Sequence, residues 1–235
     1  MKKIAIITGT HRGIGHALAK SFLETGDYLV WGLSRHNTLV NNGFQFFQMD
    51  LSTTDFASRL PESLPDCDEY VLINNAGVIE PICPADQIDP EQLTKIYHVN
   101  ILSVHLLVAW FLRLTACRRA KKLVINISSG AGRYPISHWS AYCSTKAALD
   151  MLSECIALEY PDIRVYSLAP GMVDTPMQHL IRSYSKERFP EVERFNAAFQ
   201  NNLLNDTYFV SNKILHLIKN TEAVPRVKIS LKDIP

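Results

Sequence analysis

The sequence predicts a single α/β domain, residues 1–235, whose core is a doubly wound parallel sheet of about seven strands. Three observations predict this fold class. Short runs of β-branched and aromatic residues alternate with helix-length amphipathic segments, which is typical of strand–helix–strand units. A glycine-rich turn follows the first of these runs. The length also fits, because single α/β domains commonly run to ~200–250 residues.

The first strand–helix–strand unit carries the glycine-rich turn. A β-branched run over residues 3–8 leads directly into Gly9-Thr10-His11-Arg12-Gly13-Ile14-Gly15, and the amphipathic helix that follows ends at Gly26. A second strand is expected over residues 28–33. Glycines at this spacing let the backbone approach a pyrophosphate, and the helix N-terminus offers free N–H groups to it. The unit predicts a Rossmann-type dinucleotide site, with a purely structural glycine turn as the alternative.

The end of the second strand indicates which dinucleotide is bound. NAD-binding versions carry an acidic residue there, which holds the ribose 2′-hydroxyl. This strand instead ends in Trp31-Gly32-Leu33-Ser34-Arg35-His36, so Arg35 stands where the acid would be, and Arg12 lies just before Gly13. Two guanidinium groups suit a 2′-phosphate, which accepts charge-assisted hydrogen bonds. The sequence therefore predicts NADP(H) as the cofactor.

The next two strands also end in polar residues. Residues 44–49 form the third strand and lead into Asp50-Leu51, where the acid accepts a hydrogen bond from an adenine amino group or, alternatively, caps a helix. Residues 70–73 form the fourth strand and lead into Asn74-Asn75-Ala76-Gly77. Because ligands bind at the carboxyl ends of parallel strands, both segments are candidates for cofactor contacts.

A long helix follows, and it is apolar nearly all round. Asp89-Pro90 is an N-cap followed by proline at the first helical position, and the helix is expected to reach about Thr115. Its most apolar part, residues 101–112, falls short of the ~20 residues that a membrane span needs. We therefore expect a buried helix. Asn100 lies inside it and requires a buried hydrogen bond or a surface position.

A proton-transfer group is predicted around the fifth strand. Residues 123–127 deliver Ser128 and Ser129 at the carboxyl end of that strand. Tyr142-Cys143-Ser144-Thr145-Lys146 then begins a helix that runs to about Tyr160, in which Tyr142 and Lys146 share one face. An adjacent cation lowers a phenol pKa from its usual ~10, toward the range of a general acid or base. An ordinary amphipathic helix is the alternative.

The rest of the chain completes the alternation of strands and helices. The expected elements are a sixth strand over residues 164–168, a turn at Pro170-Gly171, a polar and aromatic stretch over residues 175–205, a last helix from Asp206 or Ser211 to about Lys219, and a seventh strand over residues 227–231. No repeat or linker interrupts this order.

Composition and charge narrow the class of protein. The chain is 47% hydrophobic and 20% charged with a formal net charge of +1, which gives no reason to expect nucleic acid or an anionic membrane as a partner. The apolar run after Lys3 is broken at Thr8, too early for a signal-peptide core of ~7–15 residues. The five cysteines lack CxxC or metal-ligand spacing. We expect no metal, reduced thiols and a cytoplasmic location.

Six motifs stand in one order along the chain: TGTHRGIG, NNAG, the helical Asn100, ISS, YCSTK and PGMVDT. Together they resemble the short-chain dehydrogenase/reductase family. The resemblance implies that Tyr142 protonates a carbonyl oxygen and that Lys146 lowers its pKa and binds the nicotinamide ribose. It implies that Asn100 holds a relay water and that Ser129, 13 residues before Tyr142, orients the carbonyl in preference to Ser128.

The same resemblance implies where the cofactor and the substrate bind. The cofactor contacts fall on Gly9, Arg12, Gly13, Ile14, Gly15, Arg35, Asp50, Leu51, Asn75, Ala76, Gly77, Tyr142, Lys146, Pro170, Gly171, Val173 and Thr175. The substrate contacts fall on Ser129, Gly130, Tyr134, Trp139, Met172 and Met177, under a lid formed by residues 175–205. Tyr134 and Trp139 either stack on a substrate ring or pack in the core.

A narrower resemblance lies in the C-terminal half. HWSAYCSTKAALDML, YPDIRVYSLAPGMVDTPMQ and IRSYSKERF are similar to sepiapterin reductases and related bacterial benzil reductases, which use NADPH to reduce ketones in vicinal dicarbonyl or aromatic settings. Animal sepiapterin reductases place an acid in the last strand, where this chain has Ser230, with Asp233 the nearest acid. A reductase of diketones or aromatic ketones is therefore the first expectation. A pterin reductase and a non-catalytic NADP(H)-sensing protein are the alternatives.

The family resemblance also implies an oligomeric state. Two helices commonly build a dimer interface in this family, and here they are the apolar helix over residues 101–112 and the helix of Tyr142, which carries Leu149 and Leu152. The first is more apolar than packing on one sheet face requires. We expect a homodimer.

Overall fold

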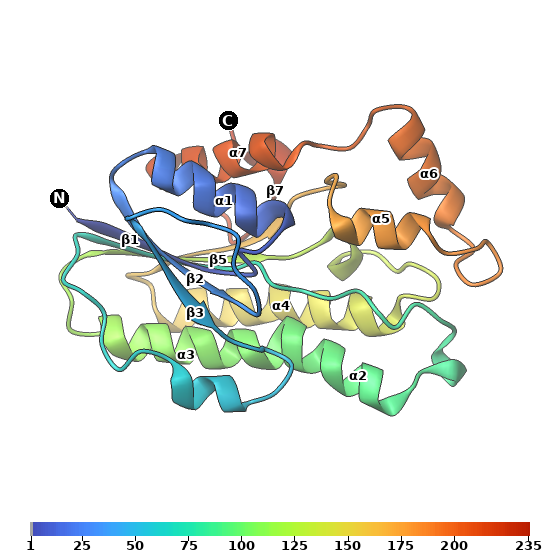
Figure 1. Cartoon of the computed structure of the whole chain (residues 1–235), viewed down its shortest axis with the longest axis horizontal. Coiled ribbons are helices and arrows are strands. Elements are labelled where there is room, and N and C mark those ends of the chain that lie inside the picture. The colour runs from blue at the N-terminus through green and yellow to red at the C-terminus, as the bar shows by residue number, and fades with distance from the viewer. Residues whose placement is uncertain (1) are drawn as a thin grey trace.

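A seven-stranded, wholly parallel sheet forms the centre of the computed structural model, which describes residues 2–235 (Figure 1). The strand order is β3-β2-β1-β4-β5-β6-β7. The strands are β1 (Lys3–Thr8), β2 (Tyr28–Ser34), β3 (Phe44–Gln48), β4 (Glu69–Asn74), β5 (Lys121–Ile127), β6 (Arg164–Ala169) and β7 (Lys228–Ser230). The predicted α/β fold with a doubly wound parallel sheet is confirmed.

Helices cover both faces of the sheet. They are α1 (Gly13–Glu24), α2 (Pro90–Tyr97), a π-helical turn (His98–Leu102), α3 (Ser103–Thr115), α4 (Ser140–Glu159), α5 (Pro176–Arg182), α6 (Val192–Gln200) and α7 (Thr207–Lys219). In Figure 1, α1 and α7 lie on one face and α3 and α4 on the other, while α5 and α6 extend past one end of the sheet.

The strand sequences explain this layering. Successive side chains of a strand point to opposite faces, so Ala5 and Ile7 join the apolar cluster that includes Leu18 of α1 and Ile214 of α7. The alternate residues of the same strand join a second cluster, formed with α3 and α4. Because both faces are covered, the central strands are continuous apolar runs rather than alternating ones.

The structure settles three element boundaries. The last helix begins after Asp206, whose side chain accepts a hydrogen bond from the Tyr208 amide at 2.8 Å, so Ser211 lies inside the helix. The predicted helix after Asp89 is interrupted by the π turn that contains Asn100. The seventh strand is two residues shorter than expected, because Leu231 begins a 3₁₀ turn.

One helical stretch, Pro90–Thr115, is long and apolar enough in composition to be weighed as a membrane span. Over half of its most apolar window, 56%, is buried inside the protein. That burial is what a core helix of a doubly wound sheet requires, because its apolar face packs on the strands.

Candidate active site

The glycine-rich turn lies at the carboxyl end of β1, where the strand order reverses between β1 and β4. Gly9 and Gly13 have φ angles of 73° and 61°, in the left-handed region that favours glycine. At Gly15 an added Cβ atom would stand 2.4 Å from the carbonyl oxygen of Gly9 and 2.4 Å from the side-chain nitrogen of Asn75. The turn is therefore closed against its neighbours in a way that only glycine permits.

The N-terminus of α1 is open to an anionic ligand. Arg12 occupies the N-cap position with extended backbone (φ −155°, ψ 170°), and its side chain makes no capping hydrogen bond. The first turn of α1 contains no acidic residue. An uncapped helix start with glycines around it presents N–H groups and the positive end of the helix dipole. These residues fit the pyrophosphate of a dinucleotide.

Thr8 fastens this turn to the loop after β4. Its hydroxyl oxygen accepts hydrogen bonds from the Asn75 and Ala76 amides, both at 2.9 Å, and the Asn75 side chain donates to the Thr8 carbonyl at 2.9 Å. Sequence reasoning missed Thr8 as a site residue. The signal that identifies it is a buried hydroxyl at the end of an otherwise apolar strand.

The two predicted phosphate-binding arginines follow neighbouring strands: Arg12 lies in the glycine-rich turn after β1, and Arg35 directly follows β2. Arg12 and Arg35 both have exposed side chains at the carboxyl ends of β1 and β2. Asp50 is in the field of Arg35 and accepts a hydrogen bond from the Ser52 amide at 2.9 Å. Burial raises the pKa of Asp50, but the Ser52 hydrogen bonds and Arg35 outweigh that effect and hold it below its usual value. The Asp50 carboxylate thus already serves a local turn, and Leu51 after it is buried.

Tyr142 and Lys146 lie together in the interior, on the face of α4 that meets β5. Their residues are 6% and 4% exposed. The Lys146 Nζ atom is 5.7 Å from the centroid of the Tyr142 ring and donates a hydrogen bond to the Ile127 carbonyl at 2.8 Å. Ser129, two residues further along, is half-buried and accepts a hydrogen bond from the Ala131 amide at 3.2 Å.

Asn100 is buried, which explains an asparagine in an apolar helix. Its Oδ1 atom accepts from the Val78 amide at 2.9 Å, and its Nδ2 atom donates to the Val78 carbonyl at 2.8 Å and to Thr145 Oγ1 at 3.1 Å. A Cβ atom at Gly77 would stand 3.4 Å from Asn100 Oδ1 and 3.7 Å from Lys146 Nζ. Asn100, Lys146 and the loop after β4 therefore meet at one point.

Burial changes the acid–base properties of this group. It raises the pKa of Tyr142 to about 12, with the Ser129 side chain acting in the opposite direction. It lowers the pKa of Lys146 to about 8, opposed by the nearby Asp150 carboxylate. The predicted lowering of the Tyr142 pKa by Lys146 is therefore wrong for the protein alone. Desolvation disfavours the charged form of both groups, and it outweighs the opposing effects of the Ser129 hydrogen bond on Tyr142 and of the Asp150 carboxylate on Lys146.

We expect this buried lysine to leave a signature in the pH dependence of stability. Below pH 8 the folded and unfolded chains both carry the charged lysine. Between about pH 8 and its ordinary value of 10.5 only the unfolded chain keeps the proton, so the free energy of unfolding rises with pH there. The difference between wild type and Lys146→Met should grow by at most about 1.4 kcal/mol per pH unit. Urea unfolding of both proteins from pH 7 to 10 measures this, and parallel curves would contradict it.

The aromatic residues predicted to contact substrate have two different environments. Trp139 is 4% exposed, its ring is stacked on Phe189 at 5.2 Å, and it meets the Tyr142 ring edge-on at 5.5 Å. Trp139 therefore packs in the apolar cluster against Phe189 and Tyr142, and its contact with a substrate stays a prediction. Tyr134 is 48% exposed and its ring lies over Gly130.

The segment over residues 175–205 contains α5 and α6, and it is hydrogen-bonded to the loops that follow β4 and β5. Thr175 caps α5 by accepting from the Gln178 amide at 3.4 Å. The Tyr184 hydroxyl donates to Glu80 at 2.7 Å, and the Ser137 amide donates to Glu191 at 3.4 Å. Met172 and Met177 are partly buried in the same apolar cluster as Trp139.

The chain leads into this segment through Pro170 and Gly171, where Gly171 has a φ of 76°. Val173, which is 4% exposed, then pairs with Asn205 in an isolated parallel bridge. The bridge ties the two ends of the segment together at its base.

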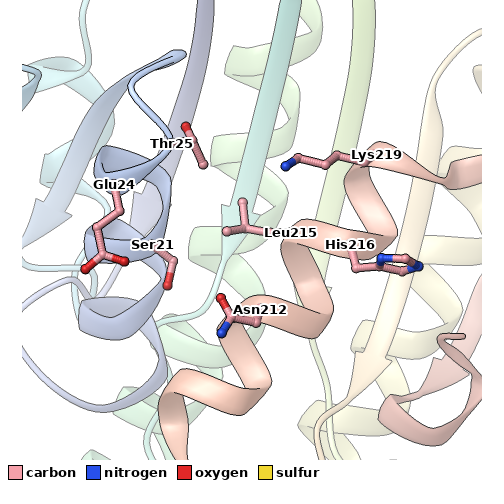
Figure 2. Close-up of a pocket in the computed structure, with 7 residues that line it drawn as sticks. All are labelled: Ser21, Glu24, Thr25, Asn212, Leu215, His216 and Lys219. Carbon is pink, nitrogen blue, oxygen red and sulfur yellow. The ribbon is translucent and has the colours of Figure 1, made fainter.

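A groove of about 380 Å³ lies elsewhere, between α1 and α7 (Figure 2). Glu24 at the end of α1 and Thr25 just after it line this groove, together with His216 and Lys219 of α7. Its charged groups have opposite signs, and none of the predicted site residues lines it. The predicted residues instead follow the carboxyl ends of the strands, mainly β1, β4 and β5, with Arg35 after β2, Asp50 after β3 and Pro170 after β6.

Comparison with known proteins identifies the class. A sequence model described as short chain dehydrogenase matches residues 3–186. The chain therefore belongs to the short-chain dehydrogenase/reductase family, and it is an oxidoreductase.

Its relatives are similar over nearly the whole chain. A benzil reductase ((S)-benzoin forming) of Bacillus subtilis is 38% identical over 232 residues, covering 94% of this chain and 95% of the relative. A sepiapterin reductase of Xenopus laevis is 31% identical over 242 residues, covering 92% and 90%. The crystal structure of a short-chain dehydrogenase/reductase from Saccharomyces cerevisiae superimposes with a TM-score of 0.82 at 25% identity, covering both chains completely.

Proposed function

We propose that this protein is an NADPH-dependent carbonyl reductase, which reduces one ketone of a vicinal dicarbonyl or an aromatic ketone. The observation that carries the proposal is the buried Tyr142–Lys146 pair on α4, beside Ser129 and a glycine-rich dinucleotide turn. The benzil reductase relative from Bacillus subtilis supports this substrate class.

In this proposal each residue has a separate task. A bound NADPH supplies the hydride, and the glycine-rich turn, the Asn75–Gly77 loop, Pro170, Gly171, Val173 and Thr175 hold it. Tyr142 donates its proton to the carbonyl oxygen, and a raised pKa of about 12 keeps the phenol protonated at neutral pH. Ser129 donates a hydrogen bond to the same oxygen. Asn100 holds a relay water beside Lys146, which it meets at Gly77, and the replacement proton reaches Tyr142 through that water and Lys146.

Arg12 and Arg35 give the preference for NADPH over NADH in this proposal. Both side chains are exposed at the carboxyl ends of neighbouring strands, and no acidic residue ends β2. A guanidinium group stays charged at any physiological pH and binds phosphate oxygens in a forked geometry.

Pterin reduction is the second candidate, and the Xenopus laevis sepiapterin reductase relative is what favours it. The last strand argues for the general dicarbonyl substrate. Ser230 takes the place of the pterin-binding acid, and Asp233 is already engaged, because it accepts hydrogen bonds from the Ser230 hydroxyl at 2.7 Å and from Arg226 at 3.2 Å.

One assay separates these functions. NADPH oxidation is followed by its nicotinamide absorbance with purified protein and benzil, sepiapterin and simple diketones. Turnover of benzil and diketones supports the proposal, and a strong preference for sepiapterin would move it to the pterin class. Tight NADPH binding with no turnover on any of them would support a non-catalytic NADP(H)-sensing protein.

We also propose a homodimer built on the outer surface of α3 and α4. The predicted contribution of Leu149 is wrong, because that residue is 1% exposed and packs against the sheet. Met151 and Leu158 are 60% and 84% exposed on the same helix, and Leu102, in the π turn before α3, is 43% exposed. Sedimentation should give a species of about twice 26.6 kDa at micromolar concentration. Material of 26.6 kDa alone would contradict it.

Two further proposals concern the whole chain. We propose that residues 1–235 fold as one domain, because a single sheet runs through all seven strands and the apolar clusters lie on its two faces. We propose a cytoplasmic location, which the five unpaired cysteines support.

A further inference from the structure

A buried carboxylate that none of these steps uses lies one helical turn beyond Lys146. Asp150 is 5% exposed. Its Oδ1 atom accepts hydrogen bonds from the Ser128 hydroxyl at 2.6 Å and from the Ser167 hydroxyl at 2.5 Å, and its Oδ2 atom accepts from Arg133 Nε at 3.2 Å. An interior charge is costly unless it is paired and hydrogen-bonded, and this one is both.

Two of the three donors flank Ser129. Ser128 directly precedes it, and Arg133 follows the 3₁₀ turn Gly130–Gly132 that Ser129 caps. The short segment that carries the Ser129 hydroxyl is therefore fastened to Asp150 at both of its ends.

Arg133 extends the same connection to the edge of the sheet. Its Nη2 atom donates to the Ser167 carbonyl of β6 at 3.2 Å and to the Ile229 carbonyl of β7 at 2.9 Å. One guanidinium thus joins α4, the Ser129 segment and two strands. A lysine at this position has no fork with which to do so.

The helix holds the segment at two more points. Lys146 donates to the Ile127 carbonyl, immediately before Ser128. Gly132 presses against the helix backbone, since a Cβ atom there would stand 2.7 Å from the carbonyl carbon of Lys146. Residues 127–133 therefore pack on the same stretch of α4 that carries Lys146 and Asp150.

We propose that Asp150 and Arg133 act as a positioning pair, here called the Asp150–Arg133 clamp. The clamp holds the Ser129 hydroxyl where it and the Tyr142 hydroxyl can reach the same carbonyl oxygen. The proposal rests on the proposed reductase function. Ser129 and Tyr142 must reach the same carbonyl oxygen although they lie on different elements, and the clamp joins those elements into one body. A misplacement of about 1 Å at a reacting centre lowers a rate by roughly 10²-fold.

Two variants test the clamp, and a third is the matched control. Asp150→Asn keeps the side-chain size and removes the charge, while Ser128→Ala removes only one donor. We expect kcat to fall about 10–100-fold in Asp150→Asn and by a smaller factor in Ser128→Ala, with KM for NADPH nearly unchanged. Glu154→Gln, one turn further along α4, breaks a pair with Lys228 of β7 at 3.1 Å without touching residues 127–133, and should keep full activity.

Hydrogen exchange gives a readout that does not depend on turnover. Amides in residues 128–134 should exchange faster in Asp150→Asn and Ser128→Ala, and at the wild-type rate in Glu154→Gln. If Asp150→Asn fails to fold, Ser128→Ala decides the test, because it leaves the Arg133 pair in place.

Wild-type kcat and wild-type exchange in the folded variants would overturn the clamp. So would an unchanged kcat with a raised KM for NADPH, because that pattern locates the effect at the cofactor. If the wild-type protein reduces no carbonyl compound, the proposed function fails. In that case hydrogen exchange alone decides the clamp. Faster exchange of residues 128–134 in Asp150→Asn and Ser128→Ala would support it, and wild-type exchange would overturn it.

Discussion

Replacing Tyr142 by phenylalanine is expected to lower kcat by about 10²–10⁴-fold, the usual contribution of a positioned general acid. The substitution removes one oxygen and keeps the ring that packs against Trp139. Affinity for NADPH should therefore stay close to that of the wild type. Steady-state kinetics with a diketone, together with NADPH binding followed by fluorescence, measure the two effects separately.

Tyr97→Phe is the matched control for this experiment. Tyr97 also directs a phenol toward α4, where its oxygen lies 2.8 Å from the Ser144 hydroxyl, two residues along from Tyr142. Removing that hydroxyl should leave kcat within a small factor of the wild type. If Tyr142→Phe keeps wild-type turnover, Tyr142 is not the proton donor.

Replacing Arg35 by aspartate is expected to weaken NADPH binding by about 10–100-fold, the effect of losing one or more hydrogen bonds between charged groups, worth ~1.5–3 kcal/mol each. The new carboxylate repels the 2′-phosphate and, in NADH, accepts from the ribose 2′-hydroxyl instead. NADH binding should therefore change little or improve. The ratio of the two dissociation constants, measured at fixed salt concentration, gives the result.

Arg119→Asp controls for the change in net charge. Arg119 is exposed just before β5, at the amino ends of the strands and so on the far edge of the sheet from Arg35. It should leave the NADPH-to-NADH ratio as it is in the wild type. A wild-type protein without preference for NADPH, or an unchanged ratio in Arg35→Asp, would contradict the role proposed for Arg35.

Local patterns in the sequence were sufficient for the fold. The β-branched runs became strands within two residues of their expected ends. The Asp89-Pro90 signal began a helix as expected, and Asp206, one of two predicted starts, began the last helix. The positive φ angles of Gly9 and Gly13 follow from local backbone sterics. Each of these features depends on a window of a few residues, which is why the sequence alone determines it.

Tertiary packing, and not the local sequence, decided the environment of the site residues. The Tyr142 pKa moves upward rather than downward, because the packing of α4 on the sheet removes water from both Tyr142 and Lys146. Trp139 packs on Phe189, which lies 50 positions away in sequence.

The Asp150–Arg133 clamp around Ser129 separates what local spacing predicts from what only tertiary contacts bring together. YCSTK and ISS identify the candidate catalytic residues by spacing, because helical periodicity places Tyr142 and Lys146 on one face. No local pattern joins Arg133 to Asp150, Ser167 and Ile229, which meet only when α4, β6 and β7 assemble. The sequence by itself determined the elements and the chemical groups they carry. Tertiary packing decided the burial, the charge states and the register of those groups, because desolvation and contacts between distant segments exist only in the folded chain.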